Sequence, residues 1–112
     1  MKTEIVEKPW GRELIWAKNG KYVGKILFVK KGERLSKQYH NIKDETMLLY
    51  KGEVDITIGE ETRRIKAGEK ESFEIKPGVV HRIEAIEDSE IIEVSTPELW
   101  DVVRIEDSYS RK

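Results

Sequence analysis

The chain has 112 residues, of which 21 are basic and 22 acidic, so its formal net charge is −1. This length predicts a single domain, residues 1–112, with a core of useful size. The charges are spread along the chain, so no basic stripe favours nucleic acid, and no apolar stretch is long enough for a membrane span or a secretory signal. The absence of cysteine excludes disulfides and thiolate metal sites, and we expect a cytoplasmic protein.

Lysine and glutamate dominate the charged residues, which make up 38% of the chain. Glutamine and asparagine are scarce. This bias is typical of proteins from hot environments and indicates a thermophile. It also draws attention to the one glutamine, Gln38.

Apolar and polar residues alternate with a period of two along much of the chain. In chain order, the runs that indicate strands are 22–29, 45–50, 54–58, 72–75, 81–85 and 90–95. Glycine and proline turn signals separate them at intervals of about 8–12 residues, which is typical of an antiparallel sandwich or barrel. Residues 97–101 allow one short helical turn, and the strand pattern is complete by residue 95. The sequence therefore predicts a small all-β domain.

The only two histidines and the only glutamine fall in one spaced pattern with a glutamate: Gln38, His40, Glu45 and His81. All four side chains can ligate a divalent metal. Gln38 and His40 are two residues apart, so they share one face of a strand, and the polar residues 41–44 can turn the chain toward a neighbouring strand. His81 must be delivered by the fold. The alternative is four surface residues placed by accident; the shared register favours a metal site.

The spacing of these residues resembles the first cupin motif: Gly32, five residues, Gln38, one residue, His40, four residues, Glu45, six residues, Gly52. The family more often has histidine at the position of Gln38. The second motif is partly present, with Gly68, Gly78 and His81 matching; Pro77 is one position nearer the histidine than usual, and Ala85 replaces an asparagine. The resemblance implies a small antiparallel β-barrel of the double-stranded β-helix (jelly-roll) type, with residues 1–112 as a single cupin domain.

A narrower resemblance covers nearly the whole chain. The segments 7–11 (EKPWG), 22–26 and 32–40 are similar to the type II mannose-6-phosphate isomerase domain, and 103–111 resembles its terminal Arg-x-x-Asp-x-Tyr-x-Arg signature. In many relatives this domain follows a sugar nucleotidyltransferase domain, which this sequence does not contain. Whether a free-standing copy is an enzyme therefore stays open.

The resemblance implies one divalent ion held by Gln38, His40, Glu45 and His81: zinc first, with manganese, cobalt, nickel or iron as alternatives. Such an ion is a Lewis acid able to polarise a sugar carbonyl. Oxygen-activating cupins usually present three histidines and a glutamate, so the glutamine favours non-redox chemistry and makes a dioxygenase the third choice.

Further roles follow from the same resemblance. Lys25 and Arg104 are the candidate catalytic residues, and the sequence does not identify the base. The candidate substrate-binding residues are Arg104, Asp107, Tyr109 and Arg111, with the tail folding back toward the barrel mouth. The alternative for each is a solvated surface residue.

Two functional classes lead. One is a sugar-phosphate aldose–ketose isomerase interconverting mannose 6-phosphate and fructose 6-phosphate; the other is a non-catalytic, metal-containing cupin that binds a sugar or sugar nucleotide. We also expect a homodimer with residues 8–16 near the contact, because sheet edges need cover. Trp10, Trp16 and Trp100 are expected to anchor the core or that interface.

Overall fold

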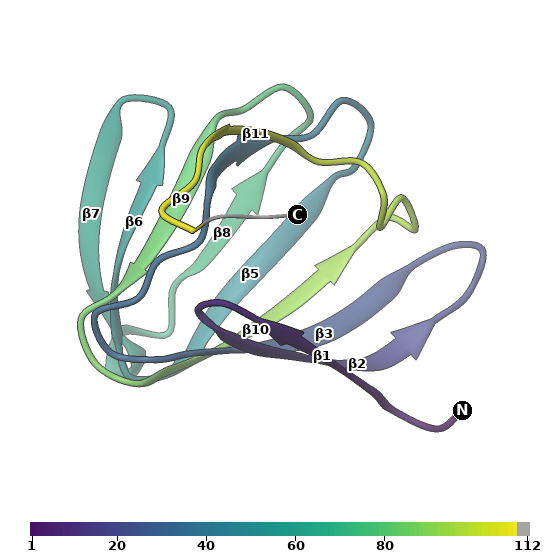
Figure 1. Ribbon diagram of the computed structural model, residues 1–112, viewed down its shortest axis with the longest axis horizontal. Coiled ribbons are helices and arrows are strands. Elements are labelled where there is room, and N and C mark those ends of the chain that lie inside the picture. The colour runs from purple at the N-terminus through teal and green to yellow at the C-terminus, as the bar shows by residue number, and fades with distance from the viewer. Residues whose placement is uncertain (110–112) are drawn as a thin grey trace.

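Residues 1–109 are described by the computed structural model, and they form two antiparallel sheets that face each other (Figure 1). The six-stranded sheet has the order β1-β2-β3-β10-β5-β8. Its strands are β1 (Glu4–Lys8), β2 (Gly11–Lys18), β3 (Val23–Val29), β10 (Ser89–Ser95), β5 (Glu45–Lys51) and β8 (Ser72–Ile75). The first and the last of the predicted strands, residues 22–29 and 90–95, both lie in this sheet, as β3 and β10.

The five-stranded sheet has the order β11-β4-β9-β6-β7. Its strands are β11 (Val103–Glu106), β4 (Lys37–Tyr39), β9 (His81–Ala85), β6 (Glu53–Ile58) and β7 (Glu61–Lys66). One 3₁₀ turn, Ala67–Glu69, follows β7, and no helix within residues 1–109 is long and apolar enough to cross a membrane. The predicted all-β, double-stranded β-helix architecture is confirmed, although the described strands stay in two sheets and do not close into one continuous barrel.

Alternation along the strands builds the core. On β3 the side chains of Leu27 and Val29 point inward and are buried, while those of Ile26 and Phe28, which alternate with them, stay partly exposed on the outer face. The same pattern on β10 buries Ile91. Burial of large aliphatic side chains of this kind contributes roughly 1.5–3 kcal/mol each.

Four strands were not predicted: β1, β2, β7 and β11. The strand expected to carry Gln38 is present as β4. In β7 only Ile65 is buried, so the strand carries almost no apolar signal. The expectation that strands end at residue 95 is wrong, because β11 pairs with β4. Residues 97–101, which could form one short helical turn, contain a single hydrogen-bonded turn in which the Asp101 N–H donates to the Glu98 carbonyl at 3.1 Å.

The three tryptophans lie in different environments. Trp10 is 3% exposed and belongs to the core. Trp16 stands on the outer face, where its ring covers Gly24, and a Cβ at Gly24 would come within 2.6 Å of that ring. Trp100 is 74% exposed. The prediction of a core anchor therefore holds for Trp10.

Candidate metal centre

The candidate ligands converge from both sheets. His40 directly follows β4, and His81 begins β9, where its Cα is the register partner of Gln38. Glu45 begins β5, which belongs to the opposite sheet. The sequence predicted that residues 41–44 turn the chain into a neighbouring strand. In the structure they cross from the five-stranded sheet to the six-stranded sheet instead. The site ties the two layers together at one end of the sandwich.

Three of the four predicted ligands form a compact buried cluster. His40 Nε2 lies 3.1 Å and His81 Nε2 3.3 Å from the same oxygen, Oε1 of Glu45. The ligand atoms of the three residues all lie within 4.8 Å of one another. The structure therefore contains a possible His/Glu/His metal site.

Hydrogen bonds to the backbone fix the two imidazole rings. The Nδ1 atom of His81 faces the carbonyl oxygen of Val79 at 3.0 Å, and Nδ1 of His40 faces the carbonyl of Asp101. A ring that donates from Nδ1 leaves the Nε2 lone pair for a metal, an arrangement typical of metal-ligating histidines. His81 Nε2 is buried and has no hydrogen-bond partner among the described residues. A cation would satisfy this orphaned atom, so the donor set fits a divalent ion.

Gln38 lies in β4 and lines the same cavity as His40 and Glu45. Its Oε1 accepts a hydrogen bond from Ser36 Oγ at 3.3 Å. The structure brings Gln38 to the site, and its role as the fourth ligand remains a prediction.

A chain of buried charges leads away from the cluster. Lys43 Nζ lies 3.3 Å from Oε2 of Glu45 and 3.4 Å from Oε2 of Glu93. Lys25 Nζ then lies 3.7 Å from Glu93 and 3.2 Å from Glu13. With three carboxylates and two ammonium groups, this network can carry one net negative charge, which suits an additional cation.

Of this network, sequence reasoning identified Glu45 and Lys25 and missed Glu13, Lys43 and Glu93. One signal was available for Glu93. It stands between Ile92 and Val94 at an inward position of a strand predicted from its alternation, two residues from Ile91. A charged residue at a core-facing position is rare unless it is paired, and so it marks a site.

The pKa values of the two glutamates next to Lys43 are shifted in opposite directions. Burial would raise the pKa of Glu45, but the adjacent imidazoles of His40 and His81 and the charge of Lys43 outweigh burial and lower it. Burial, followed by the nearby charge of Glu45, raises the pKa of Glu93 to about 7. Glu45 is thus held as the carboxylate that a metal requires.

Asp101 organises the crossing loop. Its Oδ1 accepts the backbone N–H of Asn41 at 3.0 Å, and Oδ2 accepts those of Ile42 at 2.6 Å and Lys43 at 2.8 Å. Its backbone carbonyl also holds His40. Backbone hydrogen bonding lowers the pKa of Asp101 to about 2. Asp101 is therefore a positioning residue, which sequence reasoning did not find.

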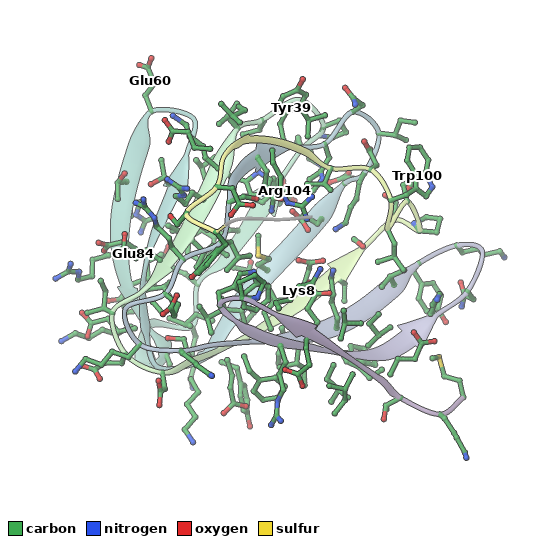
Figure 2. All side chains as sticks on the ribbon, in the orientation of Figure 1. Lys8, Tyr39, Glu60, Glu84, Trp100 and Arg104 are labelled. Atoms are coloured by element: carbon green, nitrogen blue, oxygen red, sulfur yellow. The ribbon has the colours of Figure 1, made fainter. Side chains whose placement is uncertain are left out.

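A cavity of about 210 Å³ is lined by His40 and Glu45 of the cluster, but not by His81. Its wall is rich in charged groups: Lys8, Glu13, Lys25, Lys43, Glu93 and Arg104. Figure 2 shows Lys8 and Arg104 near the opening between the two sheets, whereas Trp100 lies on the outside. The cations at the rim can attract an anionic substrate.

The terminal segment reaches this opening only in part. Arg104 is the register partner of Gln38 and lines the cavity. Tyr109 instead donates its hydroxyl to Glu33 and packs against the core, while Asp107 Oδ1 accepts the Tyr109 N–H at 3.3 Å. Neither Asp107 nor Tyr109 is among the residues that line the cavity. Arg111 lies outside the described residues.

The sequence profile of a family described as mannose-6-phosphate isomerase C-terminal matches residues 1–107. The chain belongs to this family. Its curated relatives include mannose-1-phosphate guanylyltransferase ManC of Salmonella typhimurium, 34% identical over 95% of this chain, and xanthan biosynthesis protein XanB of Xanthomonas campestris, 32% identical over 95%. The chain spans about a quarter of the length of these relatives, 23% in both cases.

Solved structures support the fold of this family member. An RmlC-like cupin from Shewanella frigidimarina superposes with a TM-score of 0.77 at 17% identity, covering 88% of this chain and 86% of the other. The capsular polysaccharide assembling protein CapF from Staphylococcus aureus gives 0.76 at 18% identity, covering 96% and 33%. Both structures therefore share this fold at low sequence identity.

Proposed function

We propose that this chain is a metal-dependent aldose–ketose isomerase of a sugar phosphate, with mannose 6-phosphate and fructose 6-phosphate as the first pair to test. The observation that carries the proposal is the His40–Glu45–His81 cluster, of which His40 and Glu45 line a cavity that Lys8 and Arg104 also line. The family to which the chain belongs supports the same class of substrate.

The protein groups divide the work in this scheme. A divalent ion held by the cluster, with Gln38 as fourth ligand, would supply a Lewis acid for a carbonyl. Zinc suits the histidine and carboxylate donors, and cobalt, nickel and manganese are tested beside it. Arg104 and Lys8 bind the phosphate at the rim, because a guanidinium offers a planar fork that matches phosphate oxygens.

Isomerisation also requires a group that moves a proton between neighbouring carbons. Lys25 is held between Glu13 and Glu93, so its ammonium serves as an electrostatic and positioning group. The two carboxylates that face the cavity besides Glu45 are Glu13 and Glu93. We assign proton transfer to one of this pair.

The experiment is an assay of the purified chain, loaded in turn with Zn²⁺, Mn²⁺, Co²⁺ and Ni²⁺, that follows fructose 6-phosphate formed from mannose 6-phosphate. The expected result is turnover that disappears in His81→Ala and falls by about 10²–10⁴-fold in whichever of Glu13→Gln and Glu93→Gln removes the proton carrier. Arg104→Gln should chiefly raise KM, and Arg64→Gln, a change on the outer surface where Arg64 pairs with Asp55, is the matched control. Absence of turnover with all four metals, in protein shown to hold one equivalent, contradicts the proposal.

A second candidate function is a non-catalytic domain that binds a sugar or a sugar nucleotide through the same cavity. The observation that favours it is that relatives such as ManC are named as guanylyltransferases and are about four times as long as this chain. Guanylyl transfer to mannose 1-phosphate yields GDP-mannose, so calorimetric titration with GDP-mannose is the test. Binding that depends on His81 and Arg104 without any turnover of mannose 6-phosphate supports this alternative.

A further inference from the structure

Lys43 contacts the candidate ligand Glu45 through the carboxylate oxygen that the imidazoles do not face. Its Nζ lies 3.3 Å from Oε2 of Glu45, whereas Nε2 of His40 and Nε2 of His81 lie 3.1 and 3.3 Å from Oε1. The side chains of Lys43 and Glu45 are only 6% and 2% exposed, so bulk water has little access to either oxygen. The two oxygens of this carboxylate therefore have different partners.

Lys43 is held at both of its ends. Its backbone N–H donates to Oδ2 of Asp101 at 2.8 Å. Its ammonium group bridges Glu45 and Glu93, with Nζ 3.4 Å from Oε2 of Glu93. The loss of a carboxylate partner from a buried ammonium group is strongly destabilising. The contact between Nζ and Oε2 of Glu45 is thus a fixed feature of the site.

This contact limits how Glu45 can bind a divalent ion. A carboxylate binds such an ion through one oxygen or through both. Binding through both requires Oε1 and Oε2 to face the ion together, but Lys43 already pairs with Oε2. Hydrogen bonds from groups outside the ligand set orient ligating carboxylates in this way and tune the ion. We propose that Lys43 restricts Glu45 to coordination through Oε1 alone, and so keeps one position on the ion free for a substrate oxygen.

A free coordination position distinguishes catalytic metal sites from structural ones. The predicted ligands supply one donor atom each when Glu45 uses a single oxygen, and one more when it uses both. An ion with a position left for a sugar oxygen can polarise a carbonyl as a Lewis acid. Lys43 is therefore a positioning residue, in a role that rests on the metal centre of the proposed function but not on any particular reaction.

Lys25 provides a comparison within the same charge network. Its side chain is 9% exposed, and its Nζ lies 3.7 Å from Oε2 of Glu93 and 3.2 Å from Oε2 of Glu13. No ion pair within residues 1–109 joins Lys25 to Glu45. A general effect of a buried ammonium group on the site would be shared by both lysines, whereas control of how Glu45 coordinates belongs to Lys43.

The test is infrared spectroscopy of the full chain, labelled with ¹³C at the glutamate carboxyl carbons. The Zn²⁺-loaded minus metal-free spectrum contains the carboxylate stretches that change on binding, and Glu45→Gln assigns the bands of Glu45 by their loss. The splitting between the antisymmetric and symmetric stretches is wide for binding through one oxygen and narrow for binding through two. We expect a wide splitting in the unchanged chain. The double variant Lys43→Met, Glu93→Leu, which removes the ammonium group together with its second carboxylate, should give a narrow one.

Three further variants serve as controls, each verified as folded by circular dichroism. Lys43→Arg keeps a cation beside Oε2 of Glu45 and should retain the wide splitting. Lys25→Met and Glu93→Leu leave Lys43 in contact with Glu45 and should retain it as well. Water proton relaxation by bound Mn²⁺ is a second readout, which a merely structural role of Lys43 would not change. The double variant should lose relaxation enhancement, because the second carboxylate oxygen takes the place of a water.

The outcomes separate the role of Lys43 from the proposed function. A chain that binds neither Zn²⁺ nor Mn²⁺ overturns both. A narrow splitting in the loaded, unchanged chain, or a double variant that keeps the wide splitting or no longer binds the ion, overturns the role of Lys43 and leaves the isomerase proposal standing. A wide splitting that narrows only when Lys43 is removed, in a chain without turnover of mannose 6-phosphate, supports the role of Lys43 and contradicts the isomerase.

Discussion

The interior of the sandwich has two halves that are built on the same strands and filled with opposite chemistry. Along β10 the inward residues run from Ile91 to Glu93, and along β9 they run from Ile83 to His81. One half packs aliphatic side chains into the core, and the other holds buried ammonium groups, carboxylates and imidazoles. Period-two alternation places both sets inside, so it does not distinguish them.

The difference shows where stability and function reside. Aliphatic burial stabilises the fold without any requirement for partners. A buried ion pair loses the free energy of hydration of both charges. Good geometry and added hydrogen bonds are needed to compensate for this loss, so a buried ion pair is weak evidence for stability. The apolar half therefore carries most of the stability of the fold, and the proposed function gives the polar half its role.

Removing one of the predicted metal ligands should have the largest effect of the changes considered, and the effect should be on metal affinity. His40→Ala is expected to lower metal affinity by more than 100-fold, since even loss of an outer-shell partner costs about 10–100-fold, and to abolish isomerase turnover. Competition for Zn²⁺ with a chromophoric chelator measures the affinity. Tyr39→Phe, at the end of β4 near the top of Figure 2, is the control; equal affinities for the two variants would contradict the site.

Breaking the buried charge network should come next in size. In chelator-treated protein, Lys43→Met removes the cation between Glu45 and Glu93, leaves only Lys25 beside Glu93, and should lower the free energy of unfolding by about 3–5 kcal/mol. The double variant Lys43→Met, Glu93→Leu removes both charges and should fall within about 1 kcal/mol of the unchanged chain, or exceed it. Urea unfolding measures both. A double variant as unstable as the single one would show that the network itself stabilises the fold.

Truncation in the apolar half should act on stability alone. Ile91→Ala, two residues from Glu93 on the same strand, is expected to lower the free energy of unfolding by about 2–5 kcal/mol through lost burial and a residual cavity. Zn²⁺ affinity, measured well below the unfolding transition, should stay within about threefold of that of the unchanged chain. Ile92→Ala, whose side chain is on the outer face, is the matched control and should destabilise the monomer less; a loss of metal affinity in Ile91→Ala would couple the two halves.

Sequence reasoning located much of the site because its ligands are rare residue types in a spaced pattern, and the structure brings His40, Glu45 and His81 together. It located the central strands because they are half-buried and alternate. It missed β7, which has one buried residue, and β2, where apolar residues stand side by side at Leu14 and Ile15 and a bulge breaks the register next to Trp16. Local pattern carries no signal in either case.

Other parts of the site depend on contacts between residues distant in the sequence. Glu93 meets Lys43 only because β10 pairs with β5, and β11 is a strand only because β4 offers it an edge. Asp101 lies in a short turn with no distinctive neighbours, yet it binds a loop about 60 residues away in sequence. Nonlocal register of this kind is set by the whole fold and cannot be read from one segment.

Substitution of Asp101 should have the smallest effect, and its effect on stability should depend on pH. Because its pKa in the folded chain is about 2, below the ordinary 3.8, the charged carboxylate stabilises the fold fully above about pH 4, and this contribution is lost as the pH falls toward 2. Asp101→Asn keeps one acceptor oxygen and the backbone carbonyl that holds His40, so the variant should be less stable than the unchanged chain at pH 6 and equally stable near pH 2. Urea midpoints from pH 6 to pH 2 give the comparison. Asp55→Asn, which removes half of an exposed pair with Arg64, should change little at any pH, because exposed ion pairs contribute about 0–1 kcal/mol. A constant difference between Asp101→Asn and the unchanged chain down to pH 2 would mean that the loop is held by the shape of the side chain and not by its charge.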